Sequence, residues 1–417
     1  MLKSRSGTAF AALAFTLFFI DVAGLWIWPI EEGMAIDIPK YGGFLLRVVA
    51  VLFAGGYILL HFRLSNIRNL PTSLWLVLGW LVISSLDNPF WQESLQHVVR
   101  FALFMLLFVS LADLPDIDVR LDTWLYRLLL WTIVLSLALA LLEPSLAVMR
   151  SAGLDGSVRG LFTHKNVFAE FCVMLAAWLM PSKTISGKQK GILLLLVLIA
   201  VVVSKSSASL FIFVFSLGAY YVLTLPKSAA SRSQILLLAG IGTIPAYLAG
   251  STIFAVVLQL LDRKATLTGR TYMWEYMYAI TDKIPLQGLG YGVVMKYESI
   301  VGPLRLGYYE TMTSTHNSYL DILLGLGVAG CVIFGIWVVE LLYHGCRSYV
   351  AGETAGLRLL VVGGAYLLYG TIESSAGLAD RLPTMIAIGA VMLCCLAQRK
   401  QVENGDVTAP LAAEGFR

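Results

Sequence analysis

The stretch from residue 191 to residue 225 reads GILLLLVLIAVVVSKSSASLFIFVFSLGAYYVLTL. Two long apolar runs are separated only by a short turn that contains Lys205 and four serines. A helix that crosses a bilayer needs roughly 20 mostly apolar residues, and a continuous apolar run differs from the alternating pattern of a membrane β-barrel strand. The stretch therefore predicts a hairpin of two transmembrane helices, Gly191–Ser204 and Ala208–Leu225.

The same pattern recurs along the whole chain. It predicts an all-α, polytopic transmembrane helix bundle of about 12 spans, forming a single domain over residues 1–400 and followed by a disordered cytoplasmic tail over 401–417. The other predicted spans are Ala9–Ile30, Phe44–Phe62, Pro71–Leu86, Val98–Ala112, Trp124–Glu143, Val167–Met180, Gln234–Thr252, Ser318–Tyr343, Leu357–Glu373 and Pro383–Gln398.

The amino-acid composition indicates a membrane protein and argues against a water-soluble domain or a nucleic-acid-binding protein. Of the 417 residues, 58% are hydrophobic and only 13% are charged, whereas a soluble domain averages about 25% charged residues. The net charge of +4 comes without a basic stripe or a nucleic-acid motif, so no nucleic-acid partner is expected. The five cysteines have no metal-ligand spacing and indicate buried thiols. No metal or other cofactor is predicted.

Lysine and arginine in the short loops predict the orientation. Those at the two termini and in alternate loops, near residues 63–68, 183–190, 227–232 and 347–358, fall on one side if both termini are cytoplasmic, which is the expected side for positive charge. One predicted cytoplasmic loop, 113–122, is acidic instead, but acidic residues count little in this rule. The one long loop, Ile253–Asn317, then lies on the external side. Because it is rich in tryptophan and tyrosine, we expect short amphipathic helices on the membrane surface rather than disorder.

Basic residues gather on the predicted external side, in the segment before the sixth span. Arg159 is followed by His164, Lys165 and Asn166 at the predicted start of a helix. A helix N-terminus carries partial positive charge, so this group predicts a seat for a phosphate or diphosphate. The alternative is a set of interfacial anchors that reach the lipid headgroups. Lys205 offers another cation in its serine-rich turn, where a serine could also cap the next helix.

Two further polar clusters flank the long loop. The first contains Arg270, Tyr272 and Trp274 and continues to the glycine-rich stretch 285–292. Arginine can bind two phosphate oxygens at once, and the glycines either let the backbone approach a ligand or simply form a turn. The second contains His316 and Asn317, where an imidazole could accept a proton near neutral pH.

Glu373 closes the eleventh predicted span on the same side. Its carboxylate could orient a basic residue or bind a sugar hydroxyl. A capped helix end is the alternative reading.

In this order, the motifs resemble those of the O-antigen ligase and exopolysaccharide polymerase family. The matching pieces are Arg159 with Phe162-Thr163-His164-Lys165-Asn166, then Gly269-Arg270-Thr271 with Trp274 and the run Gly288-Leu289-Gly290-Tyr291-Gly292, and then His316-Asn317-Ser318-Tyr319-Leu320. The resemblance extends from about Arg159 to Glu373, and the form of residues 162–166 is closer to the polymerase branch. One departure is Ser-Lys-Ser-Ser around Lys205, where the family often shows a Ser-x-Ser-Arg-like turn.

The resemblance implies a GT-C-like membrane glycosyltransferase in the inner membrane of a bacterium. Such enzymes use glycans linked to undecaprenyl diphosphate, invert the anomeric centre and need no metal. We therefore expect polymerisation of lipid-linked repeat units into exopolysaccharide or O-antigen at the periplasmic face. One alternative is an O-antigen ligase that transfers glycan to lipid A-core, and another is a transporter or flippase. A chain-length regulator and other polysaccharide-assembly proteins are candidate partners, besides the bilayer itself.

Within that reading, each candidate residue has an expected role. The expected catalytic residues are His316, Arg270 and Arg159. The expected substrate-binding residues are His164, Lys165, Asn166, Lys205, Asn317, Glu373, Tyr272 and Trp274.

Overall fold

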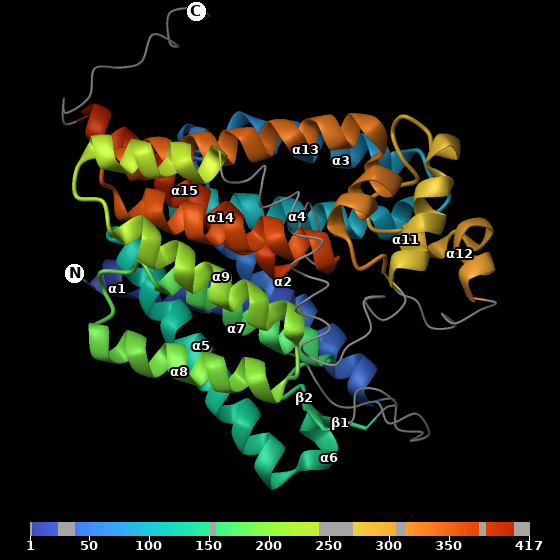
Figure 1. Cartoon of the computed structure of the whole chain (residues 1–417), viewed down its shortest axis with the longest axis horizontal. Coiled ribbons are helices and arrows are strands. Elements are labelled where there is room, and N and C mark those ends of the chain that lie inside the picture. Colours follow the sequence, from blue (N-terminus) through green and yellow to red (C-terminus); the bar gives the residue numbers. More distant parts are fainter. Residues whose placement is uncertain are drawn as a thin grey trace, which may run out of the picture.

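The computed structural model describes residues 2–23, 38–150, 156–241, 270–305, 314–374 and 381–403. Long helices dominate these residues (Figure 1). The α-helices are α1 (Leu2–Ala23), α2 (Ile38–His61), α3 (Thr72–Leu86), α4 (Trp91–Leu111), α5 (Ile117–Leu142), α6 (Pro144–Ala147), α7 (Lys165–Leu179), α8 (Gly187–Val203), α9 (Ser207–Thr224), α11 (Arg270–Ala279), α12 (Glu298–Arg305), α13 (Ser318–Val350), α14 (Thr354–Ile372) and α15 (Leu382–Glu403). A further apolar helix covers Ala229–Ile241.

Short elements fill the connections. Short 3-10 helices are η1 (Leu64–Asn69), η3 (Thr281–Lys283) and η4 (Val294–Lys296). Strands β1 (Val148–Met149) and β2 (Ser157–Val158) form one antiparallel pair, in which Val148 faces Val158. This hairpin follows α5 and α6 and leads directly to α7.

The prediction of an all-α membrane protein is confirmed for the described residues. Six helices are long and apolar enough to cross a membrane, namely α4, α5, α9, α13, α14 and α15. Other helices cover the remaining predicted spans in whole or in part. Helix α1 ends at Ala23, and the parts 24–30 and 242–252 of two predicted spans lie outside the described residues. The total of about 12 spans therefore stays a prediction, as does the GT-C fold.

One boundary needs correction. The tail was predicted to begin at residue 401, but α15 continues to Glu403. Between Gly389 and Glu403 the helix has no further glycine and no proline to stop it, so it extends beyond its apolar part. Residues 404–417 lie outside the described residues.

Helix α7 lies at the centre of the bundle. Every residue from Phe168 to Leu179 is buried, and all of them except Glu170 are apolar, which is typical of a helix at the centre of a bundle. It contacts α5, α8, α9, α14 and α15, and Figure 1 shows it in the middle of the bundle. The residues at its N-terminal end are thereby held by five neighbouring helices.

Helix α13 is broken at Gly327, where φ is 67° and ψ is −172°. The break leaves main-chain carbonyls without their helical partners, which would be costly inside a bilayer. Two side chains of α3 satisfy them, since Trp80 Nε1 donates to the Leu326 carbonyl at 3.0 Å and Ser84 Oγ donates to the Gly325 carbonyl at 2.9 Å. The long loop supplies two more donors, the N–H groups of Leu289 and Gly290.

The glycine-rich stretch 285–292 packs against the protein itself. A Cβ on Gly288 would lie 2.3 Å from the carbonyl of Gly325, and one on Gly290 would lie 2.6 Å from Asn88 Nδ2. Both glycines also have positive φ. The structure therefore supports the interpretation of this stretch as a tight turn, and the close approach it permits is to α13 and to the residues after α3.

The part of the long loop that is described contains short helices, as predicted, and they form a second apolar core with the start of α13. Its buried members are Met273, Met277, Val294, Val301, Leu320 and Leu324. Because α11 contributes two of them, this core holds the helix whose first residue is Arg270. The alternate residues Ile322 and Leu326 of α13 face the main core instead.

Candidate functional site

Four segments that are distant in sequence meet at the end of the bundle that carries α11 and α12 (Figure 1). They are the starts of α7, α11 and α13, and the end of α14. Each contributes polar side chains from its terminal residues. We call this group the Glu373 centre, and it consists of Asn166, Arg270, His316 and Glu373.

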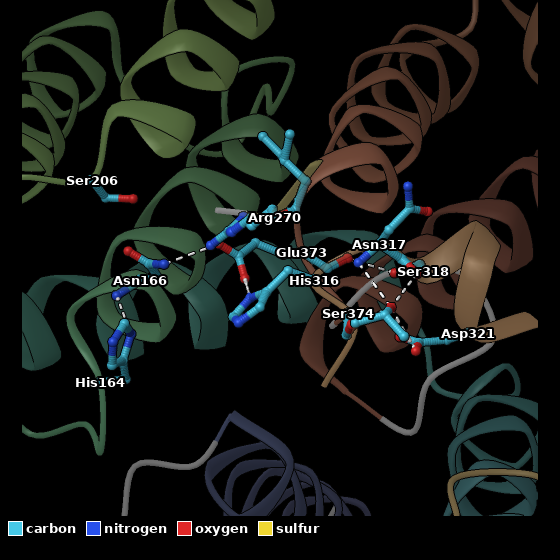
Figure 2. A network of polar contacts seen from close by, with 12 residues as sticks. His164, Asn166, Ser206, Arg270, His316, Asn317, Ser318, Asp321, Glu373 and Ser374 are labelled. Atoms are coloured by element: carbon cyan, nitrogen blue, oxygen red, sulfur yellow. Dashed lines mark hydrogen bonds and ion pairs between the residues drawn. The ribbon is translucent and has the colours of Figure 1, made fainter. Parts of the chain in front are cut away.

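Glu373 joins the other three residues of this centre (Figure 2). Its Oε1 accepts a hydrogen bond from Asn166 Nδ2 at 2.9 Å and contacts Arg270 Nη2 at 3.3 Å. Its Oε2 lies 3.2 Å from His316 Nδ1. Arg270 also donates from Nη1 to the carbonyl of Ile372. The guanidinium is thus fixed against both the end of α14 and its terminal carboxylate.

The carboxylate of Glu373 is ionised in this setting. Its side chain is only 12% exposed, and burial alone would raise its pKa. The hydrogen bond from His316 and the charge of Arg270 outweigh burial, and the pKa of Glu373 is lower than that of an ordinary glutamate. Sequence reasoning assigned Glu373 to substrate binding or to orienting a basic residue, and its contacts match the second of these interpretations.

His164 caps helix α7 rather than joining the centre directly. Its Nδ1 accepts the backbone N–H of Asn166 at 3.2 Å (Figure 2), so Nδ1 carries no proton. Burial lowers the pKa of His164, and the nearby cations Lys165 and Arg270 lower it further, against the opposing effect of Glu373. His164 therefore orients the residues that follow it, in its neutral form.

Lys165 and Lys205 form a basic surface beside the Glu373 centre. Lys165 Nζ donates to the carbonyl of Lys205 at 3.2 Å. Lys205 has a φ of 52°, in the left-handed region, and a Cβ on Gly156 would lie 3.1 Å from its Nζ. Lys205 therefore lies over the β1–β2 hairpin, and it links that hairpin to the start of α7.

Arg159 lies next to the β1–β2 hairpin. It follows β2 directly, and its Nε donates to the carbonyl of Leu146 at 3.2 Å. Gly160 makes the following turn, where a Cβ would lie 2.3 Å from Ser136 in α5. The structure thus brings Arg270 and His316 onto one carboxylate, whereas Arg159 is anchored to the end of α5 and α6.

Of three other predicted residues, two have structural partners and the third is exposed. Asn317 caps α13, with its Oδ1 accepting the N–H groups of Tyr319 and Leu320. Trp274 Nε1 donates to the carbonyl of Thr315 at 2.8 Å, so the indole is committed to the loop before α13. Tyr272 remains 66% exposed and is available to a ligand.

Sequence reasoning missed Thr315 and Asp321, which directly flank the quoted motif His316–Leu320 and lie beneath His316. Thr315 Oγ1 lies 2.7 Å from Asp321 Oδ1 and 3.3 Å from Ser374 Oγ. Asp321 lies in the first turn of an apolar helix. An acidic residue in that place was a usable signal, because an unpartnered charge there would be costly.

Residues 192–335 match the sequence model of the Wzy_C family, which is described as O-antigen ligase. This part of the chain is similar to an O-antigen ligase domain. The matched stretch includes Lys205, Arg270 and His316, whereas Arg159 and Glu373 lie outside it on either side. No curated protein matches the chain.

This similarity to the O-antigen ligase family supports a ligase- or polymerase-type function. Together with the apolar helices, it also fits a protein of the inner membrane. The Glu373 centre and the neighbouring lysines offer such a protein several cations, one carboxylate and one imidazole at the same end of the bundle. Cations of this kind stabilise phosphate charge, and an imidazole can accept a proton.

Proposed function

We propose that this protein polymerises oligosaccharide repeat units linked to undecaprenyl diphosphate, at the periplasmic face, with inversion and without a metal. The observation that carries the proposal is the shared carboxylate of Arg270 and His316. It brings a phosphate-binding group and a proton acceptor together from two separate segments of an O-antigen ligase domain.

The proposed reaction uses the cations to stabilise the leaving group. A hydroxyl of the acceptor glycan forms a bond to the anomeric carbon while the bond from that carbon to the diphosphate breaks. Negative charge grows on the departing diphosphate, where Arg270, Lys165, Lys205 and Arg159 would neutralise it. The hydroxyl proton passes to His316. Side chains thereby take the role that a divalent metal has in other glycosyltransferases.

The surroundings of the centre suit a lipid-linked substrate. The exposed ring of Tyr272 could stack on a sugar face. The membrane-embedded helices would leave the polyprenyl tail in the bilayer, while the diphosphate lies at the helix ends. This arrangement requires both termini to be cytoplasmic, as the positive charges of the loops predict.

A ligase that transfers the glycan to lipid A-core is the second candidate, and the description of the matched family favours it. The donor and its diphosphate would bind in the same way, and only the acceptor would differ. Deletion of the gene separates the two candidates. Cells without a polymerase accumulate single lipid-linked repeat units, whereas cells without a ligase accumulate long lipid-linked chains.

A transporter is a third class, and the broken helix α13 bears on it. Transporters bind substrate or ions at broken helices near the bilayer midplane. Here Trp80, Ser84 and the N–H groups of Leu289 and Gly290 already occupy the freed carbonyls. These hydrogen bonds favour a structural role for the break in α13 over a role as an ion-binding site.

The decisive experiment is the reaction of the purified protein with a defined lipid-linked repeat unit. We expect polymer from the wild type and none from R270A or H316A, with a strong reduction for R159A. Each variant should be present in the membrane at the wild-type level. If all three alanine variants make normal polymer, the site assignment is wrong.

A further inference from the structure

His316 has an unusual backbone. Its φ of 53° lies in the left-handed region, which is unfavourable for a residue other than glycine. Histidine tolerates this region better than most residues, yet it needs support from its surroundings. Strained backbone of this kind gathers at functional sites, where neighbouring contacts hold it.

Thr315 provides that support by bridging across His316. Its Oγ1 accepts the N–H of Asn317 at 3.1 Å and lies 2.8 Å from the carbonyl oxygen of the same residue. Its own carbonyl accepts the indole N–H of Trp274. Thr315 is fully buried, so these contacts are shielded from water. They close the chain around the histidine in a tight turn.

Asp321 anchors Thr315 from below. Its Oδ1 lies 2.7 Å from Thr315 Oγ1, and it stands one turn into α13, whose N-terminus favours a negative charge. Figure 2 shows Asp321, Ser374 and Ser318 on the side of the loop away from Asn166. Ser318 Oγ donates to the Glu373 carbonyl at 2.7 Å, which ties the same loop to the end of α14.

In this turn, the imidazole of His316 contacts Glu373 through one of its two nitrogens, Nδ1. His316 Nδ1 lies 3.2 Å from Glu373 Oε2. If the carboxylate accepts a proton from Nδ1, the neutral ring has its lone pair on Nε2. The His316 side chain is 37% exposed against 12% for Glu373. The ring is therefore the accessible member of the pair.

We propose that Thr315 and Asp321 are positioning residues for His316, which hold its backbone in the left-handed conformation and its Nδ1 on Glu373, so that Nε2 accepts the proton of the acceptor hydroxyl. As the acceptor oxygen bonds to the anomeric carbon and the diphosphate departs, that proton moves to Nε2. The resulting imidazolium is stabilised by the carboxylate of Glu373. This inference rests on the proposed function, because it assigns the tautomer of the residue proposed there as the base.

The test compares T315V, T315S and D321N. Valine keeps the shape of threonine without the hydroxyl, serine keeps the hydroxyl, and asparagine keeps the size of Asp321 without its charge. T132V is the matched control, because Thr132 is also buried but lies in α5. The expected loss of kcat is about tenfold for T315V and D321N, with little change in KM. T315S should restore most of the activity, and T132V should keep all of it.

A second measurement reports the tautomer without any substrate. The protein is labelled with 15N-histidine, and its five histidines give separate nitrogen signals. The signal that is lost in the variant H316Q belongs to His316. The wild type should carry the proton on Nδ1 of His316, and T315V should show a mixture of tautomers. A residue that serves only folding would lower stability and leave the tautomer unchanged.

The outcomes separate this inference from the proposed function. Normal polymer from H316A would overturn both. If H316A is inactive while T315V and D321N keep full kcat and the wild-type tautomer, only the positioning inference is overturned. A wild-type ring protonated on Nε2 would overturn it as well, whatever the activities.

Discussion

Arg270 and His316 contact different oxygens of one carboxylate, that of Glu373, at 3.3 and 3.2 Å. Arg270 begins α11 in the second apolar core, and His316 precedes α13, whereas Glu373 ends α14 in the main bundle. The carboxylate therefore connects the part of the long loop that carries Arg270 to the helices that cross the membrane. The positions of Arg270 and His316 therefore both depend on this one carboxylate.

Replacing Glu373 should reduce product formation without removing the protein from the membrane. E373Q keeps a hydrogen-bond acceptor for Asn166 but removes the charge that holds Arg270 and His316. Hydrogen bonds to charged groups contribute about 1.5–3 kcal/mol each, which corresponds to about 10- to 100-fold in rate. The rate of product formation in vitro is the measurement. The control is E353Q at the other end of α14, where Glu353 pairs with Gln401, and equal effects of the two substitutions would contradict the prediction.

Gly327 should not tolerate a side chain. A Cβ there would lie 2.0 Å from the Leu286 carbonyl oxygen, and the backbone conformation is one that glycine alone adopts readily. G327A should therefore lower the melting temperature in detergent and displace the loop 285–292. G335A lies in the same helix with open space around it, and it should leave the melting temperature unchanged or raise it slightly. A G327A protein as stable as G335A would show that the break in α13 is not needed.

The ion pair between Asp122 and Arg358 should be a stability element at the opposite end of the bundle. Both carboxylate oxygens lie 2.8 Å from Arg358 Nη2, both side chains are 3% exposed, and Trp178 Nε1 donates to the same carboxylate. Removing one partner of such a pair leaves a buried charge, at a cost of about 3–5 kcal/mol.

D122A should accordingly lower thermal stability in detergent, and the double variant D122L/R358L should recover much of it, because no charge is then left unpaired. The control D118N alters an exposed aspartate in the same helix and should have little effect. If D122A melts at the same temperature as D118N, the pair is not a stability element.

His164 should make thermal stability depend on pH. Its pKa in the folded protein is lowered by burial, whereas the unfolded chain binds the proton at the ordinary value of about 6.5. The unfolded state thus binds more protons in the window just below that value. Stability from His164 is complete above pH 6.5 and is lost as the pH falls through the lowered pKa.

The substitution H164N tests this dependence, because asparagine also caps a helix but does not titrate. Melting temperatures across pH 5–8 should fall for the wild type on the acid side and fall less for H164N. Identical curves for the two proteins would contradict the prediction.

Much of the helical architecture could be predicted from the sequence. The hairpin of α8 and α9 is visible in two apolar runs and a serine-rich turn, and the N-terminal boundary of α13 follows from Asn317, whose side chain caps it. These features are local, because a continuous apolar run or a capping side chain acts within a few residues of itself. The end of α15 was missed because helix propensity continues past the apolar part.

The candidate site could be predicted only in part. The sequence identified Arg270, His316 and Glu373 as polar residues at predicted span ends. Arg159 was placed in the same group, but the structure anchors it to the carbonyl of Leu146. Trp274 is among the expected substrate-binding residues, and its indole N–H is hydrogen-bonded to the carbonyl of Thr315. In both cases the side chain found a partner on a segment whose position no local pattern indicates.

By itself, the sequence determined that the bilayer is part of this protein's solvent, because apolar runs too long and too numerous for a water-soluble core must be covered by lipid. It also determined which residue types stand at the span ends. Only the tertiary structure decided that Glu373 joins Arg270 to His316 and that Asp321 supports Thr315. Those pairings depend on how helices from distant parts of the chain pack side by side, and a hydrogen bond forms only between atoms that packing brings within about 3 Å.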